Sequence, residues 1–102
     1  MRDELITATA KRIADELKAT IAPATGYGDL PDSQVPEQIF GERVYQAVED
    51  SGSIDFAAQI IAFATGYSDT MMNYIIWDSV DDGETLEEAI VSTAAIAWEF
   101  DF

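Results

Sequence analysis

The sequence contains no cysteine and no histidine. Without cysteine the chain can form no disulfide, no thiolate nucleophile and no cysteine-ligated metal site. Without histidine it lacks the commonest general base and the commonest zinc ligand. An enzyme built from this chain would have to work with carboxylates, tyrosine, serine, threonine or the few lysines and arginines, and a carboxylate enzyme would need two acids that converge in one pocket. We therefore expect a non-enzymatic protein that holds no cofactor and no metal.

Basic residues are also scarce, and they are unevenly placed. The chain has 20 acidic and 5 basic residues and a formal net charge of −15. The first 43 residues hold 8 of the acids and all 5 bases, which leaves 12 acids and no base in residues 44–102. The acids of this second half must therefore face solvent, a metal ion or a basic partner. A field of this sign repels phosphate and disfavours direct binding of DNA or RNA.

Long apolar runs are missing as well. No stretch approaches the roughly 18 apolar residues of a membrane-spanning helix. The N-terminal segment MRDELITATAKRIADEL carries acids where a secretory signal peptide has its basic region. We expect a cytoplasmic protein with no membrane partner.

The chain does contain ample apolar material in a helical pattern. Of its 102 residues, 48% are hydrophobic, enough for one modest core, so we expect residues 1–102 to form a single domain. Apolar residues at three- and four-residue steps predict an amphipathic helix over about residues 3–20 and four further helices. The four begin after Asp32 or Ser33 with Pro36 in the first turn, at Ser53 or Asp55 with an end near Gly66, at Ser68 or Asp69, and at a capping box of Thr85 and Glu88. The predicted fold is an all-α bundle of about five short helices.

The C-terminal residues follow a different pattern. Ile96, Trp98, Phe100 and Phe102 alternate with smaller or acidic residues, which is the period of a strand. One interpretation is a helix end that frays into a tail and places its aromatic side chains on the core. The other is a terminal strand that pairs with another chain, including a second copy in a homodimer.

A nine-residue stretch, IAPATGYGD at 21–29, returns as IAFATGYSD at 61–69 with seven of nine positions identical. In the second copy Gly66 supplies the left-handed residue that ends one helix before the next begins. In the first copy Pro23 requires the preceding helix to end earlier or to kink. Two interpretations remain: helix ends with similar local chemistry, or matching contact loops that present Tyr27 and Tyr67 to a partner.

The acidic stretch DSVDDGETLEE, Asp78–Glu88, is similar in part to a calcium-binding EF-hand loop. Asp78, Asp82 and Gly83 fall at the first, fifth and sixth loop positions. Val80 and Ala89 stand at the third and twelfth positions, where that loop needs an acid or amide and a bidentate glutamate. Because the ligand that closes the coordination shell is missing, calcium is not the expected occupant.

The same stretch suits another use. On helical segments, steps of two to four residues advance about 3 to 6 Å along the axis, comparable with the charge spacing of a nucleic-acid strand. A ridge of acids at this pitch presents to a basic groove what a phosphate backbone presents, and salt weakens the attraction. The alternative is a solvated acidic face, although such faces usually intersperse lysine and arginine. The candidate partner-binding acids are Asp78, Asp81, Asp82, Glu84, Glu87 and Glu88.

Two aromatic residues directly precede these acids. Tyr74 and Trp77 are candidate apolar anchors, because tryptophan and tyrosine at an interface carry a large share of binding energy. A tryptophan at helical spacing is also typical of a core residue, and the same two interpretations apply to Trp98.

In size and charge pattern the whole chain resembles the small acidic inhibitors that bacteriophages deploy against host defence, namely anti-restriction DNA mimics and acidic anti-CRISPR proteins. No residue motif carries the resemblance, so it transfers no functional residues. It implies an inhibitor that acts in the host bacterial cytoplasm and occupies the basic, nucleic-acid-binding surface of a nuclease or CRISPR effector. The alternative function is a small structural or adaptor protein that self-associates through its aromatic tail.

Overall fold

The computed structural model describes residues 2–21, 36–49 and 53–101. These ranges form five helices and no strand, which confirms the predicted all-α class. None of the helices is both long enough and apolar enough to cross a membrane. The helices are α1 (Arg2–Thr20), α2 (Pro36–Val48), α3 (Ile54–Thr65), α4 (Asp69–Asp81) and α5 (Leu86–Asp101).

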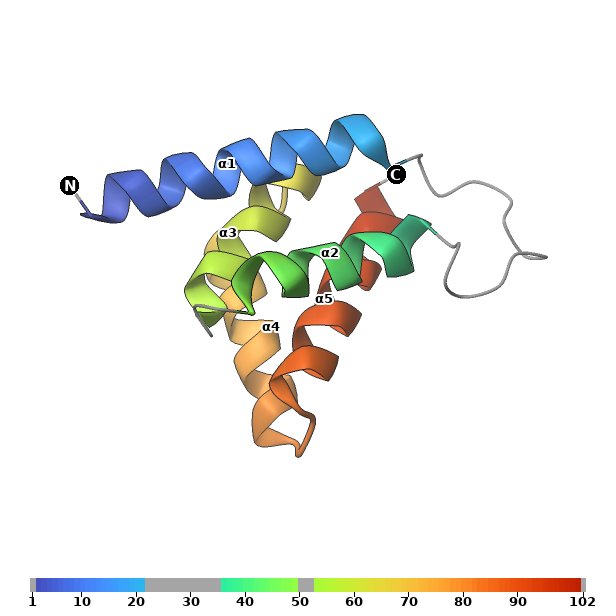
Figure 1. Cartoon of the computed structure of the whole chain (residues 1–102). Coiled ribbons are helices and arrows are strands. Elements are labelled where there is room, and N and C mark those ends of the chain that lie inside the picture. The colour runs from blue at the N-terminus through green and yellow to red at the C-terminus, as the bar shows by residue number, and fades with distance from the viewer. Residues whose placement is uncertain (1, 22–35, 50–52, 102) are drawn as a thin grey trace.

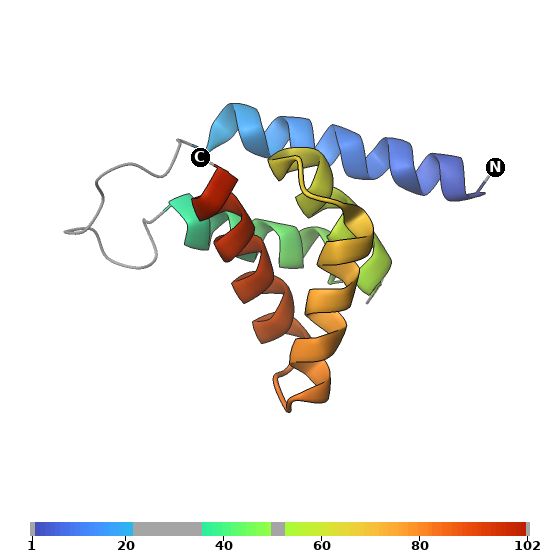
Figure 2. The same cartoon turned by 180° about the vertical axis from the view of Figure 1, so that it is seen from behind.

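The helix α3 lies at the centre of the arrangement and contacts the other four helices. The helix α1 lies across α3, and α2 packs across α5 (Figures 1 and 2). The helices α4 and α5 form an antiparallel hairpin, and both views show its turn at the end of the molecule farthest from α1. The hairpin therefore extends one end of the molecule away from the three other helices.

The starts and ends of α3 and α4 follow from local chemistry. The Ser53 hydroxyl accepts a hydrogen bond from the Phe56 N–H at 3.2 Å, and the Ser68 hydroxyl accepts one from the Met71 N–H at 3.4 Å. The sequence left a choice between serine and aspartate at both starts, and the structure has serine as the N-cap each time. Gly66 ends α3 with a φ of 85°, as predicted for a left-handed residue after a helix.

The contact between α2 and α5 is the most extensive contact between two helices in the described residues. The rings of Phe40 and Trp98 lie 4.5 Å apart between centroids, and both side chains are fully buried. Gly41 lets the two backbones approach closely, since a Cβ built at this position would lie 2.6 Å from the carbonyl oxygen of Val91. We call this contact the α2–α5 seam.

The C-terminal residues are helical, because α5 continues to Asp101. The strand interpretation of the tail is therefore wrong for the described residues. The helix-end interpretation is correct in that Trp98 lies in the core, although α5 does not fray before Asp101. Successive residues of a helix turn by about 100°, so Ile96 and Trp98 do not share a face. Trp98 is fully buried in the core, whereas Ile96 is 54% exposed.

The second copy of the repeated stretch is a helix-to-helix corner, as the first interpretation predicted. It connects α3 to α4 through Gly66 and Ser68. Tyr67 is half-buried there and packs against the core. Most of the first copy, including Pro23 and Tyr27, lies outside the described residues.

Candidate functional site

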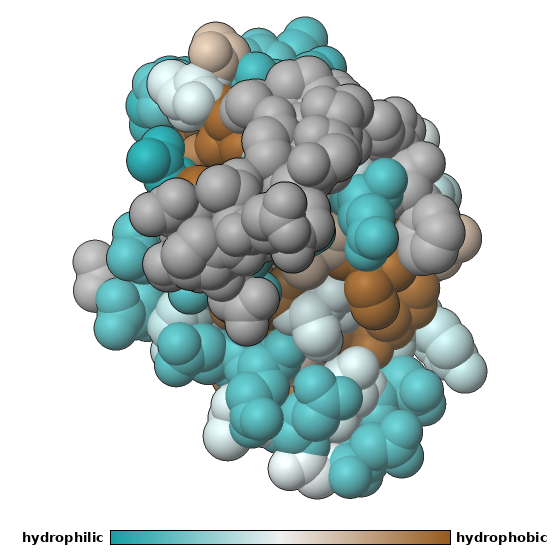
Figure 3. Space-filling model, turned by 90° about the vertical axis from the view of Figure 1, so that its right-hand side faces the viewer, coloured by the Kyte–Doolittle hydropathy of each residue, from teal (hydrophilic) through white to brown (hydrophobic). Residues whose placement is uncertain are grey.

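The six candidate acids gather where α4 turns into α5. Asp78 and Asp81 lie in the last turn of α4, Asp82 and Glu84 in the connection, and Glu87 and Glu88 in the first turn of α5. All six residues are exposed. Figure 3 shows hydrophilic residues gathered at this lower end of the molecule. We call the set Asp78, Asp81, Asp82, Glu84, Glu87 and Glu88 the acidic tip.

Backbone hydrogen bonds fix the shape of the acidic tip. The Asp82 N–H donates to the Asp78 carbonyl oxygen at 3.0 Å, and the Glu84 N–H donates to the Ser79 carbonyl oxygen at 3.1 Å. Gly83 adopts a positive φ of 105° between them. The tip is thus a turn with defined geometry that presents its carboxylates outward.

A capping box starts α5, as the sequence predicted. The Thr85 N–H donates to Glu88 Oε1 at 3.1 Å, and the Glu88 N–H donates to Thr85 Oγ1 at 3.1 Å. Hydrogen bonding from the Thr85 backbone, followed by that from its side chain, lowers the pKa of Glu88 below its ordinary value of 4.5. Glu88 therefore has a structural role as well as a place in the acidic tip.

The charge of the tip is not neutralised from within the second half of the chain, which contains no lysine or arginine. In the described residues the one ion pair joins Arg12 to Glu16 on α1. Three of the six acids are also placed unfavourably with respect to the helix macrodipole. Asp78, Asp81 and Asp82 stand at the negative C-terminal end of α4, where an acid costs about 0.3 to 1 kcal/mol. Helix stability therefore does not account for their placement.

The geometry of the acids differs from the straight ridge that the sequence suggested. Because the chain reverses at Asp82 and Gly83, the acids surround an apex and do not follow one helix axis. The helix α2 adds a carboxylate that the sequence did not reveal. Glu42 lines a hollow of about 390 Å³ between α2 and α5 together with Glu84, Glu87 and Glu88.

The two aromatic candidates of α4 are exposed, unlike Trp98. The side chain of Tyr74 is 71% exposed and that of Trp77 is 51% exposed. The core interpretation is thus correct for Trp98 and wrong for Trp77. Trp77 directly precedes Asp78, so an aromatic surface adjoins the acidic tip.

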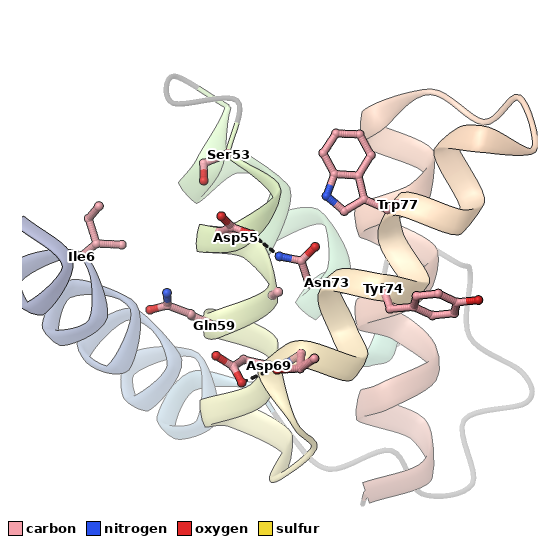
Figure 4. Close-up of a pocket in the computed structure, with 10 residues that line it drawn as sticks. Ile6, Ser53, Asp55, Gln59, Asp69, Asn73, Tyr74 and Trp77 are labelled. Atoms are coloured by element: carbon pink, nitrogen blue, oxygen red, sulfur yellow. Dashed lines mark hydrogen bonds between the residues drawn. The ribbon is translucent and has the colours of Figure 1, made fainter.

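A groove lies on the side of Trp77 that is opposite to the acidic tip. It has a volume of about 750 Å³, and α3 forms its floor between α1 and α4 (Figure 4). Figure 4 shows Tyr74 pointing away from α1. We call this groove, which is lined by Ile6, Asp55, Gln59, Asp69, Asn73 and Trp77, the α3 groove.

Asp55 and Asp69 are not among the six candidate partner-binding acids, and the sequence singled them out as possible helix starts. They stand close to the N-termini of α3 and α4, where acids are common for reasons of helix stability alone. Only the packing of α4 against α3 brings them to one groove. Sequence spacing carries no signal of that contact.

Tyr67, the described tyrosine of the repeated stretch, does not join the acidic tip. Tyr67 precedes α4, at the end opposite to the tip, and the helix between them is about 20 Å long. Tyr67 lines a separate hollow with Phe63 and Asp69. Tyr27 lies outside the described residues, so the paired contact loops stay a prediction.

The described residues contain no group of three or more acidic side chains arranged to hold a metal ion. Comparison of the chain with models of known protein families, with curated proteins and with solved structures gives no match. The site must therefore be interpreted from its own geometry and charge.

Proposed function

We propose that the protein is a non-enzymatic inhibitor whose acidic tip occupies a basic, nucleic-acid-binding surface of another protein. The observation that carries this proposal is the acidic tip itself. Six exposed carboxylates gather at the projecting end of a hairpin in a half of the chain that has no cation. Three of them stand at the end of α4, where the macrodipole disfavours them.

Such a tip would act by competition. A groove that binds nucleic acid is lined by lysine and arginine, and a compact group of carboxylates offers those residues the charge that phosphates offer. Long-range attraction would speed the encounter with the groove and would weaken as salt screens the charges. The nuclease or CRISPR effector implied by the resemblance to phage inhibitors is a partner of this class.

Self-association through an aromatic tail is not a second proposal. Its basis was the two-residue alternation near the C-terminus, and this segment is the end of α5. A truncation after Ala97 would not test self-association, because it would remove Trp98 from the core.

The experiment is capture of partners from a nuclease-treated bacterial lysate by the immobilised protein at low and high salt. The Debye length falls from about 10 Å at 0.1 M to about 3 Å at 1 M salt. We expect a basic nucleic-acid-binding protein to be retained at low salt, released at high salt, and displaced by added DNA or RNA. Retention that neither salt nor nucleic acid disturbs would contradict the proposal.

A matched pair of variants locates the site. The tip variant carries Asp81→Lys, Asp82→Lys, Glu84→Lys and Glu87→Lys, and it leaves Glu88 in place because Glu88 caps α5. The control variant makes the same charge change at four exposed acids outside the tip, Glu4, Asp15, Glu49 and Glu99. We expect the tip variant to lose capture and the control variant to keep most of it, with the helical circular dichroism of both unchanged. Equal loss in both variants would show that net charge, and not the tip, attracts the partner.

A further inference from the structure

The α3 groove offers hydrogen-bond acceptors and no positive charge. Its floor and its α4 wall carry the carboxylates of Asp55 and Asp69 and the amides of Gln59 and Asn73. None of its described lining residues is basic. A ligand that complements this lining must bring hydrogen-bond donors and positive charge.

The acceptors retain bonding capacity. Asp55 accepts a hydrogen bond from the Asn73 amide (Figure 4), and Asp69 Oδ1 accepts one from the Thr70 N–H at 2.9 Å. A carboxylate has about four acceptor positions, so both acids can accept further donors. The Gln59 Oε1 atom is shielded from solvent and has no hydrogen-bond partner.

The aromatic residue at one end of the groove favours one kind of cationic ligand over another. Trp77 is half-exposed at the boundary between the groove and the acidic tip. The face of an indole ring attracts a cation, and it stacks more favourably with the planar guanidinium of arginine than with the compact ammonium of lysine. Arginine also spreads five donors in a fork, which suits acceptors that come from two different helices.

Trp77 connects the groove with the acidic tip. Asn73, Trp77 and Asp81 follow one another at four-residue steps along α4, so their side chains lie on neighbouring turns of one side of the helix. A partner surface that rests on the tip would therefore continue toward the groove along this side of α4.

From charge complementarity, we infer that the α3 groove binds an arginine side chain of the basic partner, with the guanidinium against Trp77 and its donors toward Asp55. The inference rests on the proposed function for the class of partner alone. It adds a discrimination that the tip does not supply, because exposed carboxylates on a turn attract lysine and arginine alike. Arginine content near the partner's nucleic-acid site would then decide which basic proteins bind.

The test uses two synthetic peptides of equal charge, Lys-Lys-Arg-Lys-Lys and Lys-Lys-Lys-Lys-Lys, with the full chain at low salt. Binding is followed by tryptophan fluorescence and by calorimetry. We expect the arginine peptide to bind about 3- to 10-fold more tightly, because the guanidinium adds stacking and a fork of donors to the cation–π attraction that lysine also makes. Equal affinities, or no binding of either peptide, would overturn the inference.

Variants place the preference in the groove. Trp77→Leu and Asp55→Asn should each reduce the ratio of the two affinities toward one, whereas Trp77→Phe, which retains an aromatic face, should keep most of it. The matched control is Asp78→Asn, which removes the same charge from an exposed residue of the tip outside the groove lining. This variant should weaken both peptides equally and preserve the ratio. A ratio that falls in Asp78→Asn and survives in the groove variants would contradict the groove assignment and leave the proposed role of the tip intact.

Discussion

The two tryptophans of the chain lie in the same helical hairpin but in opposite surroundings. Trp98 of α5 is fully buried against Phe40 in the α2–α5 seam, whereas Trp77 of α4 is half-exposed beside the acidic tip. The seam consists of apolar side chains and closely approaching backbones, which stabilise the fold. The outer side of α4 and the tip expose aromatic rings and unneutralised carboxylates, and among these carboxylates only Glu87 and Glu88, at the start of α5, stabilise a helix. The molecule thus separates a region built for stability from a region whose composition stability does not explain.

The largest expected difference between the regions comes from removing each tryptophan in turn. Trp98→Ala leaves a cavity in the seam and should lower the free energy of unfolding by about 3 to 5 kcal/mol. Trp77→Ala removes a half-exposed ring and should cost less than about 1 kcal/mol. Urea unfolding followed by circular dichroism measures both. Similar losses for the two variants would show that the outer side of α4 also supports the fold.

The seam itself is tested at Gly41. A methyl group in Gly41→Ala would lie 2.6 Å from the Val91 carbonyl oxygen, so the two helices must move apart. The intrinsic preference of alanine for helix offsets part of the cost. We expect a net loss of about 1 to 2 kcal/mol in the free energy of unfolding, within the range of overpacked cores. Gln46→Ala, at an exposed position of the same helix, is the control and should change stability by less than about 0.5 kcal/mol. A Gly41→Ala variant that is more stable than the natural chain would mean that α2 and α5 can move apart at little cost in free energy.

The features that the sequence predicted are those that depend on neighbours along the chain. Ser53, Gly66 and Ser68 mark helix ends through hydrogen bonds that span only a few residues. The capping box at Thr85 follows from the identities of two residues in one helical turn. The helical pattern of apolar residues also sufficed for the all-α class.

The features that the sequence did not predict depend on contacts between helices. Trp77 and Trp98 both stand at helical spacing, and the packing of the helices, which places Phe40 of α2 against Trp98, decides which of them is buried. Glu42 lines one hollow with acids of the tip because α2 packs closely against α5. Asp55 and Asp69 line one groove because α4 packs on α3. The alternation of apolar residues at Ile96 and Trp98 has the period of a strand, but both residues belong to α5. The helix places Ile96 on an exposed face and Trp98 on a buried face.

The capping box supports both regions, because it fixes the tip and starts the helix that forms the seam. Thr85→Ala should lower the free energy of unfolding by about 0.5 to 2 kcal/mol, as for other N-cap residues. Thr85→Ser, which retains the hydroxyl, is the control and should lose less. Thermal unfolding of both variants measures the effect. A loss as large with serine as with alanine would contradict the role of the hydroxyl.

The same capping box predicts a dependence on pH. The folded state lowers the pKa of Glu88, so the unfolded state binds the proton more tightly. The contribution of the Glu88 carboxylate to stability should therefore be fully present above pH 4.5 and disappear as the pH falls through its lowered pKa. Glu88→Gln does not titrate, so the difference in stability between it and the natural chain should shrink over this interval. A difference that is constant with pH would exclude the carboxylate as its source.

The smallest expected effect distinguishes the two sides of the tip itself. Asp81 stands at the C-terminal end of α4 and Glu87 in the first turn of α5, so the helix dipoles act on them in opposite directions. Asp81→Asn should raise the free energy of unfolding by about 0.3 to 1 kcal/mol, and Glu87→Gln should lower it by a similar amount. Both variants remove one negative charge from the same end of the molecule, so relief of general repulsion is common to them. The difference between the two variants therefore isolates the effect of the helix dipole.

The difference in stability between the two variants should shrink as salt rises, since both residues are exposed. A stabilising Asp81→Asn that also weakens partner capture would show that the tip keeps this acid for binding at the expense of helix stability, whereas a destabilising one would assign Asp81 to the fold.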